Sequence, residues 1–372
     1  MMGGRFRLGG GGVCSLWLNG EEVYLLRGAE RERIRTCSRG EVQAAVDDLN
    51  KQVDRLVVAT VDWILRDEDE KQAAVARVAA AGAALFMCLA PRQEDRDLLV
   101  DMIDGQVAVV VPGSNDTPIE WLYLGGDPLQ ADPRLFLGYD RVVCQTAPGR
   151  VLGPDEVKRT RNWDRFDVPP HGSPILVGYA EDCGLAAEDP GRERRVFDRA
   201  SCQVLPLERL ASGRVASSLE KLQTFMNSRR HVAHFRSHGV RRDGARPAVL
   251  RVCDGFLIEE SDVTPSRVNC CGSTVVLNAC EGMSLRYGVE NSMAARFFAA
   301  GAGQVVGATS RLATEYATDF MEEFYSRAFA GNCIGDSLLG ARQSLVDRTS
   351  NPLALSYGYI GTYAAKVVQE AA

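Results

Sequence analysis

Residues 231–239, with the sequence HVAHFRSHG, and residues 273–282, with the sequence STVVLNACEG, decide the fold of this chain. Each stretch is a short, largely apolar run that leads to a reactive side chain, His238 in the first and Cys280 in the second. Parallel α/β sheets deliver functional groups in this way, because the carboxyl ends of their strands meet at one edge, where such sheets bind ligands. The pattern predicts that His238 and Cys280, which are 42 residues apart, form a thiol–imidazole dyad.

The second half of the chain alternates between strand and helix patterns, which is typical of a mostly parallel sheet covered by helices on both faces. Apolar runs of strand length predict strands at 174–179, 203–206, 231–235, 274–278, 304–308 and 357–363. Apolar residues at three- and four-residue spacing predict helices at 215–227, 292–300, 313–330 and 333–347. The fold class is therefore expected to be α/β.

The first half carries different patterns. Asn19-Gly20 between two apolar runs predicts a β-hairpin over 13–26. Helical spacing follows at 41–65 and 67–86, and 106–112 is typical of a buried strand. A segment rich in Pro, Gly and charge at 146–173 predicts a domain boundary. We expect a flexible Gly-rich tail at 1–12, an N-terminal half at 13–170 and a second half at 171–372.

Composition narrows the class of protein. The 372 residues carry a formal net charge of −6, so neither nucleic acid nor an anionic membrane is an expected partner. No apolar run approaches the roughly 18 residues of a membrane span. The 11 cysteines show no CxxC spacing, which predicts reduced thiols and a cytoplasmic location. The basic cluster at 192–195 is expected to be a solvated face, because acidic residues interleave it.

The dyad implies a specific chemistry. Cys280 is the candidate nucleophile, because a thiolate attacks carbonyl carbon atoms. His238 is the candidate base, which removes the thiol proton and later protonates the leaving amine. The backbone N–H groups of Gly239 and Cys280 are the candidate oxyanion hole, since Gly239 has no side chain to keep a substrate carbonyl away. This chemistry needs no cofactor and no metal ion.

The same residues also have structural interpretations. Free cysteines are often buried in protein cores, which would explain Cys280 taken alone. His231 and His234 are expected to be structural. A metal site that joins the histidines of 231–238 to Cys270 or Cys271 is disfavoured, because a strand would spread the histidines over both faces and no metal-ligand spacing is present.

Further stretches make the chain resemble the CHAT family of caspase-like cysteine peptidases, which are relatives of separase and, more remotely, of caspases. The family's histidine motif is similar to residues 232–239, and its cysteine motif is similar to residues 275–280. The other stretches that resemble the family are 294–307, Phe324-Tyr325 with Gly331, 337–342, and 118–123 with Phe136, Leu137 and Arg141. The resemblance therefore covers about residues 105 to 365.

The resemblance implies a caspase-like sheet flanked by helices, a catalytic second half, and a degenerate N-terminal half that is pseudo-protease-like. It also implies a cysteine endopeptidase that cleaves a protein partner, such as a gasdermin-like pore-forming protein, in a bacterial antiviral defence or cell-death system. A separate sensor or activator protein is expected as a second partner. The alternatives are a non-catalytic interaction module that retains the fold, and another thiol hydrolase or acyltransferase that uses the same dyad.

One departure from the family bears on specificity. Relatives that cut after Arg or Lys carry an acidic residue shortly after the strand that follows the nucleophile, whereas this chain has Arg311, 31 residues after Cys280. We therefore expect no preference for Arg or Lys at the cleaved bond. The alternative is that Arg311 pairs with Glu315 or another surface carboxylate. Asp254 and Glu281 are the remaining candidate substrate-binding residues.

Overall fold

The computed structural model describes residues 12–19, 21–28, 30–111, 117–145, 173–182, 185, 191–207, 215–228, 230–240, 249–252, 256–270, 272–280, 282–283, 292–361 and 365–367. The strands in these residues are β1 (Gly12–Asn19), β2 (Glu22–Arg27), β3 (Glu30–Arg35), β4 (Gln106–Val111), β5 (Val142–Gln145), β6 (Leu176–Glu181), β7 (Gln203–Pro206), β8 (Val232–Val240), β9 (Val249–Val252), β10 (Phe256–Ile258), β11 (Thr274–Ala279), β12 (Gln304–Ala308) and β13 (Tyr357–Ile360). The main helices are α1 (Arg39–Thr60), α2 (Glu68–Leu89), α3 (Gln93–Ile103), α4 (Leu137–Asp140), α7 (Arg192–Arg199), α8 (Val215–Asn227), α9 (Met293–Ala299), α10 (Thr314–Ala328) and α11 (Ile334–Thr349).

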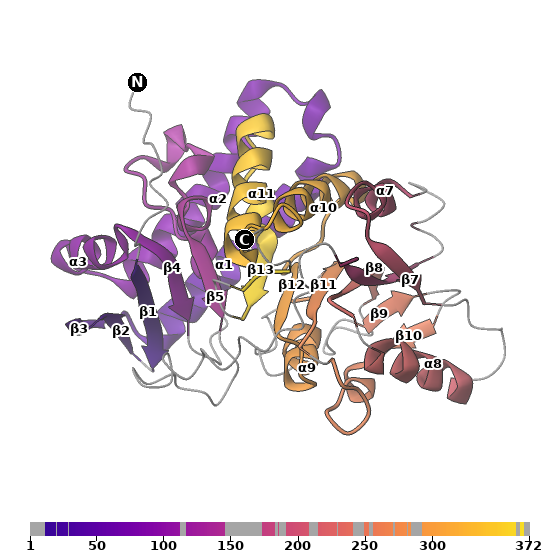
Figure 1. The fold of residues 1–372 in the computed structure, drawn as a ribbon. Coiled ribbons are helices and arrows are strands. Elements are labelled where there is room, and N and C mark those ends of the chain that lie inside the picture. The colour runs from indigo at the N-terminus through magenta and orange to yellow at the C-terminus, as the bar shows by residue number, and fades with distance from the viewer. Residues whose placement is uncertain are drawn as a thin grey trace.

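Across the described residues, the strands form one sheet of 13, in which eleven follow the order β10-β9-β8-β11-β12-β13-β5-β4-β1-β2-β3 (Figure 1). The other two branch from this path, since β6 pairs with both β8 and β7. The four strands β6, β8, β11 and β12 run parallel to one another. They form the part of the sheet that carries the two sequence motifs.

Helices cover both faces of these parallel strands. Because side chains alternate along a strand, Val276 of β11 packs with residues of α10 and α11, whereas Val275 and Leu277 pack with residues of α8 and α9. Figure 1 shows α7, α10 and α11 over one face of the sheet and α8 and α9 over the other. The sheet is thus the middle of three layers, as the sequence predicts.

The parallel strands of the first half run in the opposite direction. β1, β4 and β5 are parallel to one another, and β5 is parallel to β13. β13 is antiparallel to β12 and so reverses the direction between the two halves. The carboxyl ends of β4 and β5 therefore lie at the sheet edge opposite to the carboxyl ends of β8 and β11. This half also has a core that is formed chiefly by α1, α2, α3 and the strands β1 to β4.

Most elements expected from the sequence are confirmed. The hairpin of β1 and β2 turns between Asn19 and Glu22, and β7, β12 and α8 have the predicted bounds. The apolar pattern of the sequence does not predict β3, β5, β9, β10 or α7, because each is short or rich in charge and lacks a clear apolar period. The expected tail at 1–12 and the expected boundary at 146–173 fall almost entirely outside the described residues, so the division into two domains stays a prediction.

In the described part of the chain, α2 is the one helix long and apolar enough to span a membrane by length and composition. Half of its most apolar window is buried, and Val75, Val78 and Leu85 belong to the core that it shares with α1. Packing inside the protein accounts for this composition. The expectation that the chain has no membrane partner stays a prediction.

Arg342 of α11 joins the two halves of the sheet. Its side chain is fully buried, and its guanidinium donates to the carbonyl oxygen of Gly138 in α4 at 3.1 Å and to that of Tyr357 in β13. Burial lowers the pKa of Arg342, and the negative charge of Glu120 counteracts this effect. Arg342 therefore satisfies two backbone carbonyls and offsets the charge of Glu120 at the same time.

We predict that Arg342→Ala lowers the free energy of unfolding by about 3–5 kcal/mol, because it leaves Glu120 as an uncompensated buried charge. Arg348→Ala on the same helix is the control, since Arg348 is half exposed and pairs with Asp319 at 2.7 Å. Exposed ion pairs contribute at most about 1 kcal/mol. Urea denaturation of both variants is the measurement, and similar losses in the two would contradict the role given to Arg342.

Candidate active site

His238 and Cys280 are neighbours because their strands are in register. β8 and β11 are adjacent and parallel, and Ser237 is paired with Ala279, so His238 and Cys280 are the next residues of the two segments. Cys280 directly follows β11, as predicted. β8 is longer than the predicted strand. β6 pairs with it only as far as Arg236, and β9 then pairs with residues 238–240 on the same side.

Gly239 permits the close approach of the two segments. A Cβ added to Gly239 would overlap with the carbonyl oxygen of Cys280 and lie 3.3 Å from the Cys280 Cβ. No side chain fits between the two backbones at this point, so glycine is the residue that the packing requires. The backbone next to His238 therefore touches the backbone of Cys280.

The thiol of Cys280 faces the connection between β12 and α10. Its Sγ is a weak donor to the carbonyl oxygen of Leu312, at 3.8 Å, and the residue is half-buried. Arg311 precedes Leu312 and is exposed. The structure thus brings His238, Gly239 and Cys280 together and places the backbone of Arg311 at the same edge.

The other candidate substrate-binding residues, Asp254 and Glu281, lie outside the described residues. The nearby acidic segment Glu260–Asp262 forms a short 3-10 turn. The N–H of Glu259 donates to Asp262 at 2.9 Å, and Arg267 pairs with Asp262 at 3.4 Å. Local contacts therefore hold the Asp262 carboxylate.

The first two histidines of 231–239 have structural roles, as predicted. His231 Nδ1 accepts from the N–H of Leu176 at 2.8 Å. His234 is fully buried, and its ring nitrogens contact Tyr325 and Glu193, each at 2.8 Å. Among the residues that the structure describes, no group of three or more His, Cys, Asp or Glu side chains could hold a metal ion.

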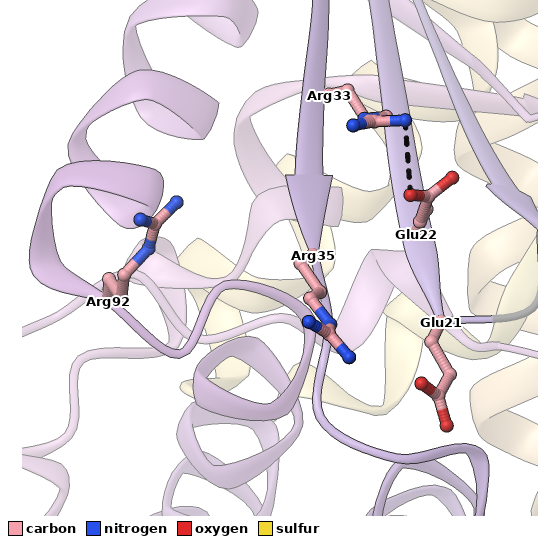
Figure 2. Close-up of a pocket in the computed structure, with 5 residues that line it drawn as sticks. All are labelled: Glu21, Glu22, Arg33, Arg35 and Arg92. Carbon is pink, nitrogen blue, oxygen red and sulfur yellow. Dashed lines mark ion pairs between the residues drawn. The ribbon is translucent and has the colours of Figure 1, made fainter.

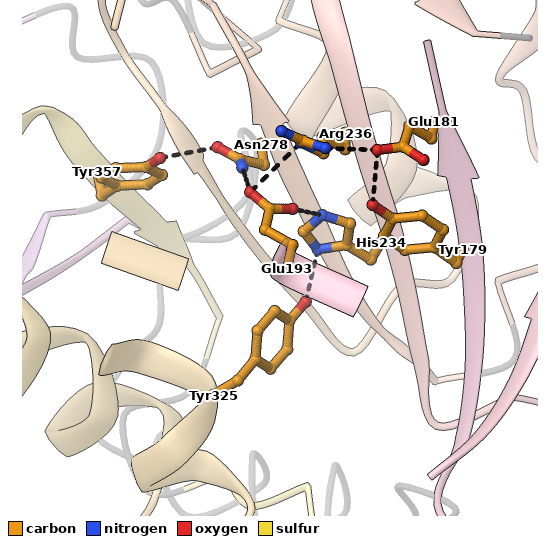
Figure 3. Close-up of polar contacts among 8 residues, drawn as sticks. All are labelled: Tyr179, Glu181, Glu193, His234, Arg236, Asn278, Tyr325 and Tyr357. Atoms are coloured by element: carbon orange, nitrogen blue, oxygen red, sulfur yellow. Dashed lines mark hydrogen bonds and ion pairs between the residues drawn. The ribbon is translucent and has the colours of Figure 1, made fainter. Parts of the chain in front are cut away.

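A network of polar side chains contacts β8 and β11, the two strands that carry the motifs (Figure 3). This buried polar network consists of Tyr179, Glu181, Glu193, His234, Arg236, Asn278, Tyr325 and Tyr357. Glu193 of α7 is at its centre, because one carboxylate oxygen contacts His234 and the other accepts from the side-chain amide of Asn278. The Tyr357 hydroxyl donates to the Asn278 Oδ1 at 2.8 Å, and Arg236 donates to Glu181 at 2.5 Å.

The buried polar network and the dyad lie on the same face of the sheet. Side chains two residues apart on a strand share a face, so Arg236 precedes His238 on β8 and Asn278 precedes Cys280 at the end of β11. The register pairs Arg236 with Asn278. On each of the two segments, a residue of the network therefore comes two positions before the residue of the dyad and points to the same face.

Glu193 corrects the interpretation of the cluster 192–195 as a solvated face. The side chain of Glu193 is only 1% exposed. It belongs to the inner stripe of α7 with Val196 and Phe197, which are also buried. This i, i+3, i+4 stripe is the signal in the sequence that would have placed Glu193 inside. The exposed arginines Arg194 and Arg195 lie on the outer face of the same helix.

The tyrosines of the buried polar network stay protonated. Burial raises the pKa values of the Tyr325 and Tyr357 hydroxyls well above 10, and the negative charge of Glu193 adds to this effect. A negative charge on Cys280 raises the pKa of Tyr357 further. Tyr357 is therefore within electrostatic reach of both Glu193 and the thiol, and it acts as a hydrogen-bond donor.

A cavity of about 570 Å³ lies elsewhere, on the hairpin of β2 and β3 (Figure 2). It is lined by Glu21, Glu22, Arg33, Arg35 and Arg92. Two of its three arginines already pair with carboxylates, Arg33 with Glu22 at 3.4 Å and Arg92 with Asp95 at 2.7 Å. Its lining includes no thiol and no imidazole, and β2 and β3 lie at the other end of the sheet from β8 and β11. The dyad is therefore the better candidate for chemistry.

Comparison with known proteins supports the fold. No protein-family model and no curated protein matches the sequence. A Saccharomyces cerevisiae separase in complex with securin has a TM-score of 0.56 at 10% identity, covering 94% of this chain and 30% of that chain. The Arg-specific cysteine proteinase gingipain R has a TM-score of 0.52 at 7% identity, covering 74% of this chain and 68% of that chain.

Both of these proteins are caspase-like cysteine peptidases. At such identities the likeness shows the fold alone. The chain therefore has a caspase-like α/β fold, with a large central sheet flanked by helices, as the sequence predicts. It spans less than a third of the separase chain that it matches.

We predict that Gly239→Ala slows alkylation of Cys280 by iodoacetamide about 100-fold. The added Cβ overlaps with the Cys280 carbonyl oxygen, so the thiol has to move away from His238. A displacement of about 1 Å between groups that act together has an effect of this size. Peptide mapping by mass spectrometry measures the rate at Cys280. Gly126→Ala is the matched control, since a Cβ at Gly126 meets nothing within 4 Å. If both variants are alkylated at the wild-type rate, the close contact between Gly239 and Cys280 does not control the thiol.

Proposed function

We propose that this protein is a cysteine endopeptidase of the caspase-like type, with Cys280 as nucleophile and His238 as general base. The observation that carries the proposal is the close contact between Gly239 and the Cys280 backbone, which the register of the adjacent parallel strands β8 and β11 makes possible. The caspase-like fold supports it. Ligand binding at the carboxyl edge of such a sheet is the general rule.

The reaction follows from the chemistry of a thiol and an imidazole. His238 removes the proton of Cys280, and the thiolate attacks the carbonyl carbon of the substrate peptide. The N–H groups of Gly239 and Cys280 stabilise the oxyanion that forms. His238 then protonates the leaving amine, which leaves a thioester on Cys280. Water attacks the thioester, releases the carboxylic acid and restores the thiol.

A peptide library tests this function. We expect the wild-type protein to cleave peptides and both Cys280→Ala and His238→Ala to lose cleavage, because each removes one partner of the dyad. Cleavage that persists in Cys280→Ala would contradict the proposal. If the wild type cleaves no peptide but is labelled by thiol-reactive acyl probes, a different thiol hydrolase or an acyltransferase is the better conclusion. If it does neither, the fold serves as an interaction module.

The position of Arg311 leads to a prediction about which residue the protein prefers at the cleaved position of a substrate. It is exposed beside Leu312, whose carbonyl the Cys280 thiol contacts. A guanidinium at this edge repels a substrate cation and attracts a carboxylate. We therefore predict a higher kcat/KM for peptides with Asp or Leu at the cleaved position than for peptides with Arg, and Arg311→Glu is expected to reverse the order. Faster cleavage after Arg by the wild type would contradict this prediction.

The resemblance to the CHAT family extends the proposal to the biological role. On that basis the substrate is one specific protein, gasdermin-like in type, and the system is a bacterial defence or cell-death pathway in the cytoplasm. A separate protein would act as sensor or activator. The N-terminal half would support the catalytic half as a pseudo-protease-like partner.

A further inference from the structure

We propose that Glu193 is a positioning residue that holds the His238 and Cys280 segments in one arrangement. The inference rests on the proposed function, since it concerns the same dyad. Glu193 belongs to neither motif and comes from the charged cluster 192–195, which the sequence pattern predicts to be a solvated face. Its role follows from which strands its two carboxylate oxygens contact.

One carboxylate binds both motif-bearing strands. Glu193 Oε2 contacts His234 of β8 at 2.8 Å, and Oε1 accepts from the amide of Asn278 of β11. Oε1 also lies 3.9 Å from the Nε of Arg236. His234 and Arg236 precede His238 by four and two residues, and Asn278 precedes Cys280 by two residues. A shift of one strand along the other would therefore disrupt these contacts together with the spacing of the dyad.

The partners of Glu193 are themselves fixed. Asn278 has one orientation, because its oxygen accepts from Tyr357 while its nitrogen donates to Glu193. His234 stacks on Tyr179, with the ring centres 5.4 Å apart and the planes at 10°. A Tyr325 hydroxyl that donates to His234 Nδ1 leaves Nε2–H to donate to Glu193. Glu193 therefore contacts groups with little freedom to follow it if it moves.

Stability alone is a poor explanation for this arrangement. Glu193 and Arg236 are each 1% exposed, and His234 is fully buried. Removing charges from water is costly, and buried ion pairs can often be replaced by apolar side chains with no loss of stability. Where such groups are kept, one attested use is to specify a single packing arrangement. Here the arrangement that they specify is the register and spacing of the two segments with the dyad.

The test measures the reactivity of Cys280 and needs no substrate. We expect Glu193→Gln to lower the rate of Cys280 alkylation by iodoacetamide about 10- to 100-fold, and to move the pH midpoint of that rate upward, because the imidazole no longer assists the thiol. Cys202 is the internal reference, since it is also half-buried and burial raises its pKa to about 12. Peptide mapping resolves the two thiols.

A matched variant separates positioning from general loss of structure. Glu120→Gln neutralises another buried carboxylate, 4% exposed, that lies near Arg342 and outside the buried polar network. It should leave the alkylation rate and pH midpoint of Cys280 unchanged. If Glu193→Gln unfolds the protein, the buried Cys144 and Cys270 become labelled as well. Tyr357→Phe then decides, because it removes only the hydroxyl that orients Asn278 and should still slow Cys280.

The outcomes distinguish the two proposals. If wild-type Cys280 reacts no faster than Cys202, the dyad is not activated, and both the proposed function and the role of Glu193 are wrong. If wild-type Cys280 is fast and folded Glu193→Gln matches it in rate and pH midpoint, only the role of Glu193 is wrong. A slow Cys280 in Glu193→Gln, beside an unchanged Glu120→Gln, supports the positioning role.

Discussion

The contact between Gly239 and Cys280 is the constraint on which the rest of the account depends. It exists because β8 and β11 are adjacent, parallel and in register, so that His238 and Gly239 of β8 lie beside Cys280, which directly follows β11. A side chain at Gly239 would push the segments apart. The helices on both faces pack against the strands and hold them in position. In the buried polar network, Glu193 contacts His234 of β8 and Asn278 of β11 and so links the same two strands.

The parallel strands of the two halves have their carboxyl ends at opposite edges of the sheet. β13 reverses the strand direction, so the carboxyl ends of β4 and β5 lie opposite to the edge with His238 and Cys280. Only the second half therefore presents the carboxyl ends of its parallel strands at this edge. Arg342 ties the first half to β13 through the carbonyls of Gly138 and Tyr357. Tyr357 begins β13, and its hydroxyl donates to Asn278 of the buried polar network.

The sequence predicts the central part of this structure because its apolar periods are clear there. The runs that lead to His238 and Cys280 could be placed on strands, and parallel strands bring their carboxyl ends together. Glu193 is harder to identify as a buried residue from the sequence. It stands among four charged residues at 192–195, and only Val196 and Phe197 indicate the buried face of the helix. Asn278 and Arg236 stand out only once strand periodicity shows that they share a face with the dyad. Contacts between distant segments, such as Glu193 with Asn278, depend on packing that no local pattern encodes.

The most direct test of the central claim is covalent capture by a peptidyl acyloxymethyl ketone, a reagent that an activated thiolate attacks. Intact mass spectrometry would count the adducts, and peptide mapping would locate them. We expect one adduct, on Cys280, that forms rapidly in the wild type and is lost or greatly slowed in His238→Ala. Adducts spread over several cysteines, or equal labelling of Cys280 in His238→Ala, would contradict a thiol activated by His238.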